Sequence, residues 1–271
     1  MNAHPTLSII TVNLNNREGL QRTIDSVVGQ TFTGYEWIVI DGGSTDGSRE
    51  LIEQYSDHFS YWCSEPDKGI YNAMNKGIAH AKGEWLQFLN SGDWLCQPTV
   101  LERVFSNEHD ADILYGNGIY DSEGESIMRT YPKDISLTFI VNHSIHHQSS
   151  FYKRSLYEDE LFNEQYKIIS DYVFIINSIL KGKKFEFVDV VIAHTEPGGI
   201  SQSGYDEREK HNDILPLFIR RDVDYINNTI SHNAYVSNHR ILRLINNISL
   251  FIERRLKRLE SRRLGEINAK K

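Results

Sequence analysis

Residues 7–12, LSIITV, and residues 37–40, WIVI, are the two stretches that decide the fold. Both are short apolar runs rich in β-branched side chains, which predicts two buried strands. Residues 17–30 lie between them and carry apolar side chains at helical spacing, namely Leu20, Ile24, Val27 and Val28. A strand, a helix and a strand in this order predict a parallel pair joined by a right-handed crossover.

The same alternation continues to residue 115. The Ser/Asp cluster in Gly42–Ser48 predicts a turn and the start of a helix that ends at Tyr55, with Asp46 as a turn or capping residue. Further apolar runs predict strands at 59–63, 85–89 and 112–115, and helices at 70–81 and 98–105. These elements predict an α/β fold with a mostly parallel, Rossmann-like sheet flanked by helices.

The chain is less regular beyond residue 115. Strands are predicted at 148–152 and 186–193, and helices at 169–180, 208–228 and 239–263. We therefore predict one catalytic domain over 1–207, with halves at 1–115 and 116–207, and a C-terminal helical extension over 208–271.

The net charge of the chain is −8, but it is unevenly distributed. Residues 238–271 hold ten Lys/Arg and three Glu, or +7, so the other 237 residues carry −15. An acidic body is repelled by phosphates, which argues against nucleic acid as a partner. The basic tail favours attachment to an anionic membrane surface. Packing of its apolar stripe on the domain or on a partner helix is the alternative.

Two further observations concern the location of the protein. Cys63 and Cys96 lie in apolar contexts without a CxxC pair, so we expect buried thiols. No apolar stretch reaches the ~18 to 20 residues that span a bilayer, and no basic segment precedes the first apolar run. These observations predict a cytoplasmic protein, held peripherally at the membrane if the tail binds lipid.

Polar residues follow three of the predicted strands. They are Thr11 and Asn13 at the end of the first strand, Asp41 after the second, and Asn90, Ser91, Gly92 and Asp93 after the strand at 85–89. Ligands of open parallel sheets bind outside the carboxyl ends of the strands, so we expect these residues to face one crevice.

Asp41 and Asp93 have different expected roles. The Asp41 carboxylate can accept a hydrogen bond from the imide of uracil or thymine, and capping of the following turn is the alternative. The Asp93 oxygens can reach a hard cation that bridges two phosphates. The alternative for Asp93 is a structural role in its Gly-containing turn. The sequence lacks GxxxxGK[ST], HExxH and GxSxG motifs, and no GxGxxG follows the first strand.

From Leu7 to Asp93 the sequence resembles family 2 of the glycosyltransferases, which have the GT-A fold. The segments that carry the resemblance are LSIITVNLNN (7–16), SVVGQ (26–30), WIVIDGGSTDGS (37–48), SEPDKGIYNAMNKGIAHAKGEW (64–85) and FLNSGD (88–93). EPDKGIYNAMNKG followed by LNSGD is similar to bacterial enzymes that assemble surface polysaccharides of the colanic-acid type. The commoner Asp-x-Asp-Asp series is replaced here, because Asn90 and Gly92 occupy two of its acidic positions.

The resemblance implies an inverting enzyme that moves one sugar from a nucleoside-diphosphate sugar, with UDP as the expected nucleotide. The acceptor would be a hydroxyl of a saccharide or of a lipid-linked saccharide, and the cofactor Mn²⁺ or Mg²⁺. The alternatives are a sugar-phosphate nucleotidyltransferase, whose Gly-rich N-terminal phosphate loop is missing here, and a non-catalytic carbohydrate-binding protein.

The resemblance also implies roles for single residues. Thr11, Asn13 and Ser91 would line the nucleotide crevice, Asp41 would contact the base, and Asp67, Lys68 and Tyr71 would border the base or ribose. Asp171, in ISDYVFIINSILKG (168–181), would be the catalytic base, and Asp93 would bind the metal. His147 would reach the phosphates or the acceptor, and His194 the metal or the diphosphate. For each histidine, an ordinary surface or core residue is the alternative. For Gly77 we predict close packing, whereas capping and a site role stay open for Asn72 and Asn75.

Overall fold

A computed structural model describes residues 4–122 and 124–196 of the chain. The strands are β1 (Leu7–Asn13), β2 (Tyr35–Asp41), β3 (Tyr61–Ser64), β4 (Trp85–Phe88), β5 (Trp94–Leu95), β6 (Ile113–Ser122), β7 (Glu125–Arg129), β8 (Ser150–Lys153) and β9 (Phe185–Thr195). The helices are α1 (Arg17–Val28), α2 (Ser48–Gln54), α3 (Ile70–His80), α4 (Val100–Phe105), α5 (Leu137–His143), α6 (Leu156–Asp159) and α7 (Ser170–Leu180). Two short 3₁₀ helices, η1 (Ser56–His58) and η2 (His147–Ser149), complete the described elements.

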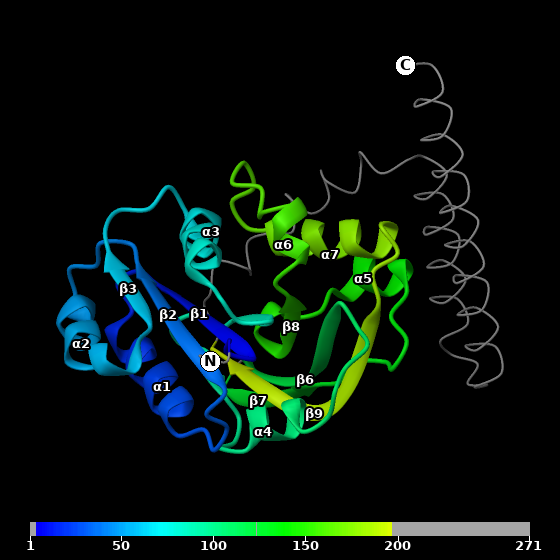
Figure 1. Cartoon of the computed structure of the whole chain (residues 1–271), viewed down its shortest axis with the longest axis horizontal. Coiled ribbons are helices and arrows are strands. Elements are labelled where there is room, and N and C mark those ends of the chain that lie inside the picture. The colour runs from blue at the N-terminus through cyan, green and yellow to red at the C-terminus, as the bar shows by residue number, and fades with distance from the viewer. Residues whose placement is uncertain (1–3, 123, 197–271) are drawn as a thin grey trace, which may run out of the picture. The chain divides into compact units, whose positions relative to one another are not determined.

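The described strands form one sheet in the order β3-β2-β1-β4-β8-β6-β9-β5, with β7 paired to β6 (Figure 1). β1 pairs in parallel with β2 and β4, and β2 in parallel with β3. The predicted α/β fold and its parallel first half are therefore confirmed, and every strand and helix predicted within the described residues is present, with small shifts at the ends of all but the strand at 112–115.

The second half of the sheet does not continue the parallel pattern of the first half. β8 lies between β4 and β6 and runs antiparallel to both. β6 is also longer than the predicted strand at 112–115, since it continues to Ser122 and forms a hairpin with β7. Local sequence does not report these features, because the neighbour of a strand is set by contacts between residues far apart in the chain.

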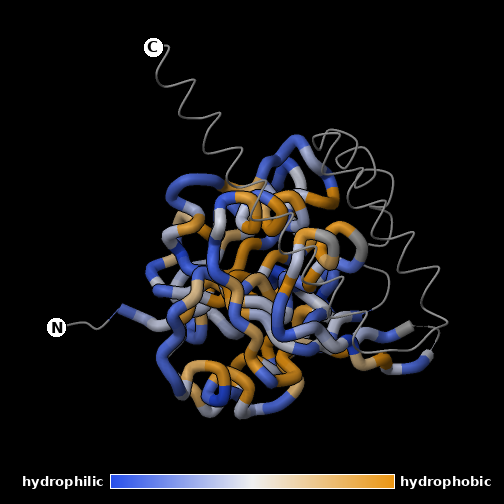
Figure 2. The backbone as a smooth tube through the Cα atoms, turned by 90° about the vertical axis from the view of Figure 1, so that its right-hand side faces the viewer, coloured by the Kyte–Doolittle hydropathy of each residue, from blue (hydrophilic) through white to orange (hydrophobic). Residues whose placement is uncertain are grey.

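Opposite faces of β1 are covered by different helices (Figure 1). Leu7 and Ile9 belong to the same buried cluster as Leu20 and Ile24 of α1. Ile10 points the other way, toward α3, where a Cβ added to Gly77 would lie 2.4 Å from the Ile10 Cγ2 atom. The predicted close packing of Gly77 is therefore confirmed. Figure 2 shows the hydrophobic residues along the strands and the hydrophilic ones along the connecting loops.

Contacts divide the chain into two compact units. The described part of the first lies within residues 4–133, 145–171 and 184–196, and therefore holds the whole described sheet and the first two residues of α7. The described part of the second is Asp134–Ser144 and Tyr172–Lys183, which includes α5 and the rest of α7. Within it, the Ser136 hydroxyl caps α5 by accepting a hydrogen bond from the Phe139 amide at 3.1 Å. The predicted boundary at residues 207 and 208, and the extension beyond it, lie outside the described residues.

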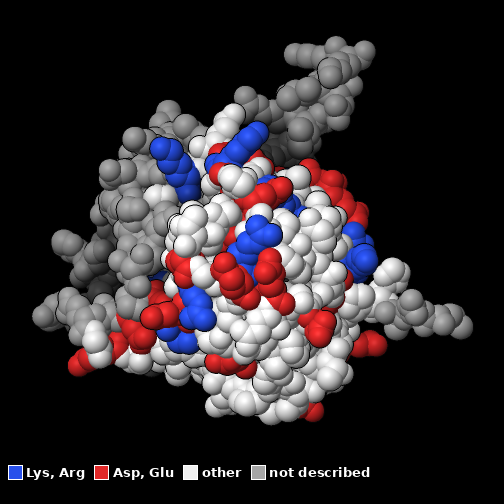
Figure 3. Space-filling view, turned by 90° about the vertical axis from the view of Figure 1, so that its left-hand side faces the viewer, with Lys and Arg blue, Asp and Glu red and all other residues white. Residues whose placement is uncertain are grey.

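Several charged side chains of the first unit pair with one another. Lys76 contacts both Glu65 and Asp67, and Lys153 contacts Glu84. On the face drawn in Figure 3, basic side chains accordingly stand among acidic ones. No helix within the described residues is long and apolar enough to cross a membrane.

Both cysteines are free thiols, and both are only partly buried, which corrects the expectation of full burial. Their burial is nevertheless enough to raise the pKa of Cys63, and it raises that of Cys96 to about 11.

Candidate active site

At the carboxyl end of β2, hydrogen-bond donors surround the Asp41 carboxylate. One carboxylate oxygen, Oδ1, accepts hydrogen bonds from the Asn13 amide at 2.7 Å and from the Ser44 hydroxyl at 2.5 Å. The other, Oδ2, accepts from the Ser64 hydroxyl and from the amides of Ser44 and Gly43. Burial acts to raise the pKa of Asp41, but these hydrogen bonds outweigh it and hold the pKa below its ordinary value. The Asp41 carboxylate is therefore ionised, and its hydrogen bonds hold the turn after β2.

Two residues of β1 were expected to line a crevice, and they differ in position. Thr11 is fully buried, and its hydroxyl accepts a hydrogen bond from the Trp37 indole at 2.9 Å. It is thus a core residue, which corrects the expectation for Thr11. Asn13 lies at the strand end, and its amide group donates to Asp41 and Ser44. The Asn13 Oδ1 atom is buried and has no hydrogen-bond partner within the described residues, so it can accept one from a ligand.

The loop before α3 carries Asp67 and Lys68. Asp67 forms an ion pair with Lys76 at 2.6 Å, and its Oδ2 lies 3.2 Å from where a Cβ on Gly42 would stand. It therefore lies beside the Asp41 turn, and its place near the base or ribose stays a prediction. Lys68 is exposed, and its backbone amide donates to the Asn72 side chain at 3.2 Å.

Tyr71 does not lie with this loop. Its side chain is buried, and its hydroxyl donates to Asp171 Oδ1 at 2.7 Å and also contacts the Ile168 carbonyl. Burial, and next the Asp171 carboxylate, raise the pKa of Tyr71 far above its ordinary value, so the phenol keeps its proton. Tyr71 thus holds the start of α7, and its place beside the base or ribose stays a prediction.

Asn72 and Asn75 of α3 also hold the segment that precedes α7. Asn75 exchanges hydrogen bonds with the Phe162 backbone, and both Asn72 and Asn75 donate to the Glu164 carboxylate at 3.0 Å. They tie the segment before α7 to α3, which is a structural role.

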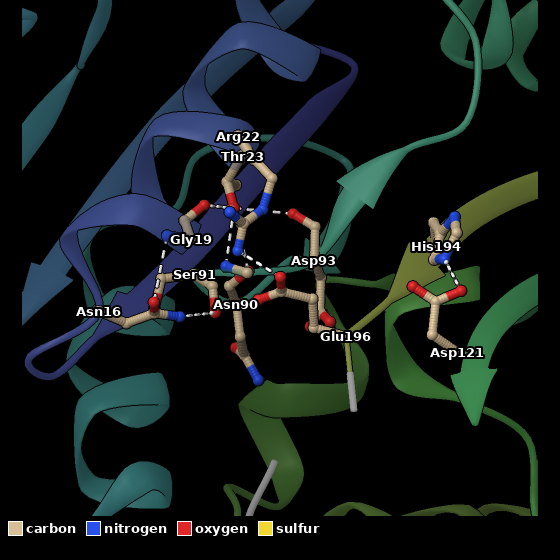
Figure 4. Close-up of polar contacts among 11 residues, drawn as sticks. Asn16, Gly19, Arg22, Thr23, Asn90, Ser91, Asp93, Asp121, His194 and Glu196 are labelled. Atoms are coloured by element: carbon tan, nitrogen blue, oxygen red, sulfur yellow. Dashed lines mark hydrogen bonds and ion pairs between the residues drawn. The ribbon is translucent and has the colours of Figure 1, made fainter. Parts of the chain in front are cut away.

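The turn after β4 is held to α1 (Figure 4). Asn16 caps α1 and donates to the Ser91 carbonyl at 3.1 Å, and the Thr23 hydroxyl donates to the Asp93 carbonyl at 2.7 Å. Gly92 has a φ of +99°, and a Cβ there would lie 2.9 Å from the Glu196 carboxylate, so only glycine fits. Ser91 contributes its backbone to this turn, and the turn positions Asp93.

The Asp93 side chain points into the interior of the first unit, where it is only 7% exposed. Its Oδ2 accepts a hydrogen bond from the Gln148 amide at 3.0 Å. Burial raises the pKa of Asp93 to about 6, although the Gln148 hydrogen bond and the nearby His147 act to lower it. Asp93 therefore has far fewer donors than Asp41.

His147 and Gln148 in η2 connect the two carboxylates for which chemistry was predicted. While Gln148 contacts Asp93, the His147 Nδ1 atom lies 3.1 Å from Asp171 Oδ2. The other ring nitrogen, Nε2, faces the Asn90 amide at 3.2 Å. The structure thus brings together the candidate metal ligand, the candidate base and three amide or imidazole side chains from distant segments.

His194 lies outside this group. Its Nε2 pairs with Asp121 Oδ1 at 2.8 Å, and its ring stacks on Trp94 at 4.0 Å between centroids. Figure 4 shows His194 turned toward Asp121 and away from Asp93. One face of its ring and its Nε2 atom are thus engaged by β5 and β6, and the approach of His194 to a metal or diphosphate stays a prediction.

The donor set fits a cation only in part. Among residues 4–122 and 124–196, no three His, Cys, Asp or Glu side chains gather as a metal site. Mg²⁺, however, is commonly held by one or two carboxylates together with substrate phosphates and water. The single carboxylate of Asp93 fits a cation that arrives with a diphosphate, and it does not fit a site that holds metal permanently.

Sequence reasoning missed the part played by two residues. Asn90 was expected to face the crevice and was noted as a replaced acidic residue, and residue 148 was placed only at the start of a predicted strand. Each is a polar side chain at one end of a strand with apolar residues, in FLN and QSSFY, and this placement is the signal that marks them. In contrast, Ser26 and Gln30 of SVVGQ serve packing, since both accept hydrogen bonds from backbone amides of Leu95 and Leu101.

Comparisons with known proteins agree with this arrangement. A family model described as glycosyl transferase family 2 matches residues 8–173. An uncharacterised glycosyltransferase of Mycobacterium tuberculosis H37Rv is 38% identical over 161 residues, which cover 58% of this chain and 62% of that protein. The chain thus matches less than two thirds of the length of this relative. A PGL/p-HBAD biosynthesis glycosyltransferase of Mycobacterium bovis BCG is 31% identical over 214 residues, 76% of this chain and 82% of its own.

Two solved structures share the fold. S. aureus TarS in complex with UDP-GlcNAc has a TM-score of 0.65 at 18% identity, covering 83% of this chain and 73% of that one. A mannosyltransferase from Pyrobaculum calidifontis in complex with GDP-Man and Mn²⁺ has a TM-score of 0.59 at 13% identity, covering 96% and 85%. Both are similar in fold to this chain. The chain therefore belongs to glycosyl transferase family 2 and has a GT-A fold.

Proposed function

We propose that the protein transfers one sugar from a nucleoside-diphosphate sugar to an acceptor hydroxyl in a single displacement that inverts the anomeric carbon. The observation that carries the proposal is the pairing of Asp93 and Asp171 across the His147–Gln148 dipeptide. One carboxylate suits the leaving diphosphate and the other suits the attacking hydroxyl.

Asp171 is the proposed general base. Its carboxylate accepts hydrogen bonds from Tyr71 and His147, so its two oxygens are held in a defined plane. Each carboxylate oxygen can accept more than one hydrogen bond, so capacity remains for the proton of an acceptor hydroxyl. A well-placed base of this kind contributes about 10² to 10⁴-fold to the rate.

Asp93 is the proposed ligand of Mn²⁺ or Mg²⁺. When bound with the donor, the cation would neutralise charge on the departing diphosphate. The residues of this chain position that carboxylate through Thr23, Gly92 and Gln148.

The nucleoside is proposed to bind at the ends of β1 and β2, with UDP as the expected nucleotide. Asn13 Oδ1 is a buried acceptor without a partner within the described residues, and Asp41 and Asp67 lie beside it. Binding of UDP-GlcNAc by TarS and of GDP-Man by the archaeal mannosyltransferase supports a nucleotide sugar as the donor class. Membership of a glycosyltransferase family disfavours the alternatives of a nucleotidyltransferase and a non-catalytic binding protein.

The acceptor is proposed to be a saccharide or a lipid-linked saccharide of surface polysaccharide assembly, used at the cytoplasmic face of the membrane. Attachment to that membrane through residues 238–271 remains a prediction, because those residues lie outside the described part of the chain. Nucleic acid is not proposed as a partner, since on the face drawn in Figure 3 the basic side chains stand among acidic ones.

The test is Asp171→Asn, which keeps the shape of the side chain but cannot take up a proton. Turnover of the nucleotide sugar should fall about 10² to 10⁴-fold, while the dissociation constant of the donor stays nearly unchanged. Turnover close to that of the unmodified enzyme would assign the base to another residue. NMR of the product's anomeric configuration tests inversion separately, and a retained configuration would refute the single displacement.

A further inference from the structure

We infer that His147 is a positioning residue for the base, and that it acts by donating a hydrogen bond from Nδ1 to Asp171 rather than by binding the diphosphate. The inference rests on the proposed function, because it takes Asp171 as the base. It concerns a contact between η2 and the start of α7 that sequence reasoning did not foresee.

The direction of the hydrogen bond follows from the partners of the ring. An ionised carboxylate can only accept, so the Nδ1 atom that lies 3.1 Å from Asp171 Oδ2 must carry a hydrogen. If the ring is neutral, Nε2 then accepts from the Asn90 amide at 3.2 Å. If the ring is charged, the Asn90 amide has to turn over so that Nε2 donates to Asn90 Oδ1, a buried atom without a partner within the described residues. In both arrangements His147 donates to Asp171.

The same geometry argues against a direct phosphate contact. Both ring nitrogens already face side chains, and His147 is only 14% exposed in its side chain. A diphosphate would have to displace Asn90 to reach Nε2, or Asp171 to reach Nδ1. Keeping both contacts leaves the imidazole as a rigid bridge between the turn after β4 and the base.

Two donors therefore orient Asp171, one on each oxygen: Tyr71 on Oδ1 and His147 on Oδ2. Other titratable groups near it are Tyr152 on β8 and Tyr157 on α6, whose pKa values are raised, first by burial and also by the Asp171 carboxylate. These phenols stay neutral over the working pH range. His147 is thus the partner whose removal should change the basicity of Asp171, since a hydrogen bond to the ionised form lowers the pKa of a carboxyl group.

Two substitutions of His147 by amide side chains test the roles of the two ring nitrogens separately. In His147→Asn the side-chain NH₂ occupies the place of Nδ1 and can still donate to Asp171. In His147→Gln the side-chain amide occupies the place of Nε2, where its oxygen can accept from the Asn90 NH₂, so the contact toward Asn90 is kept and the one to Asp171 is lost. Both variants are polar and close to the imidazole in size, and each serves as the control for the other.

The glutamine variant should lose about 100-fold in kcat, the scale expected when a reacting group is misplaced by about 1 Å. Its KM for the donor should change little, and the acid limb of its pH profile should move to higher pH. The asparagine variant should recover most of kcat and the original pH profile. If His147 had only a structural role, both variants would lose thermal stability and the acid limb of the pH profile would not move.

Three results would overturn the inference. They are normal kcat and an unmoved profile in the glutamine variant, equal losses in both variants, and a loss confined to donor affinity, which would indicate a phosphate contact. A double mutant with Asp171→Asn completes the test, because no further loss should follow once the base is gone. If Asp171→Asn alone keeps turnover, the proposed function fails; if it is inactive while His147→Gln is normal, only the present inference fails.

Discussion

The two aspartates that follow β2 and β4 have opposite electrostatic properties, although both are buried at the ends of parallel strands. Asp41 accepts hydrogen bonds from three side chains and two backbone amides, and its pKa lies below the ordinary value. Asp93 receives one side-chain hydrogen bond, from Gln148, and its pKa is raised to about 6. Burial acts in the same direction on both, so the difference lies in the donors that surround each carboxylate.

The difference indicates that the two carboxylates have different roles. A carboxylate that is already saturated with donors stabilises its turn and has little capacity left for a ligand. A carboxylate that is buried with few donors is destabilising by itself, and it gains when a cation supplies the missing charge. Asp41 therefore has the properties of a structural residue, and Asp93 those of a functional one.

The largest effect is expected for Asp93→Asn on activity. The variant should fold but lose the stimulation of donor binding by Mn²⁺ or Mg²⁺, with turnover about 10² to 10³-fold lower, as for loss of one electrostatic contact to developing charge. Donor affinity measured by calorimetry with and without metal checks this. Asp121→Asn is the matched control, because Asp121 pairs with His194 and should leave the metal effect unchanged. Equal metal stimulation in the Asp93 variant would place the cation elsewhere.

A smaller effect is expected for Asp41→Asn, and it concerns stability. Replacing one acceptor oxygen by an NH₂ group sets donors of Ser44, Ser64 and Gly43 against another donor. The free energy of unfolding should fall by about 2 to 4 kcal/mol, as measured by urea denaturation at pH 7. Asp46→Asn in the same loop is the control and should cost less, because Asp46 is exposed and Asn caps nearly as well.

The Asp41 variant also tests whether that carboxylate contacts the nucleobase, as its sequence position suggests. A stable variant that has lost uridine nucleotide affinity would support the base contact and contradict the structural role. An unstable variant with normal affinity would support the role in the turn.

The smallest effect is a gain in stability for Asp93→Asn without metal or nucleotide. Because the folded-state pKa of Asp93, about 6, exceeds the ordinary 3.8, the folded protein binds its proton more tightly than the unfolded chain. Stability should thus be lost as pH rises from about 4 through 6, up to about 2 to 3 kcal/mol. The variant should be the more stable protein at pH 7.5 and nearly equal at pH 4, in thermal or urea unfolding. A variant less stable than the parent at pH 7.5 would show that Asp93 is stabilised as an ion.

Much of the fold could be predicted because its signals are local. LSIITV and WIVI form β1 and β2, the helical spacing after Arg17 forms α1, and FLNSGD places Asp93 after β4, as expected. Hydrophobic periodicity and strand-end polarity are properties of neighbouring residues, so a single sequence carries them. The motifs were also sufficient to indicate the family that the comparisons show.

What only the tertiary structure decided is which of these residues meet. The sequence could not place Tyr71 on Asp171, turn His194 toward Asp121, or bury Thr11 against Trp37. It also could not show that β8 enters between β4 and β6, which sets η2 between Asp93 and Asp171. Such contacts join residues tens of positions apart, and their geometry and pKa values depend on the packing of the whole sheet, which no local pattern encodes.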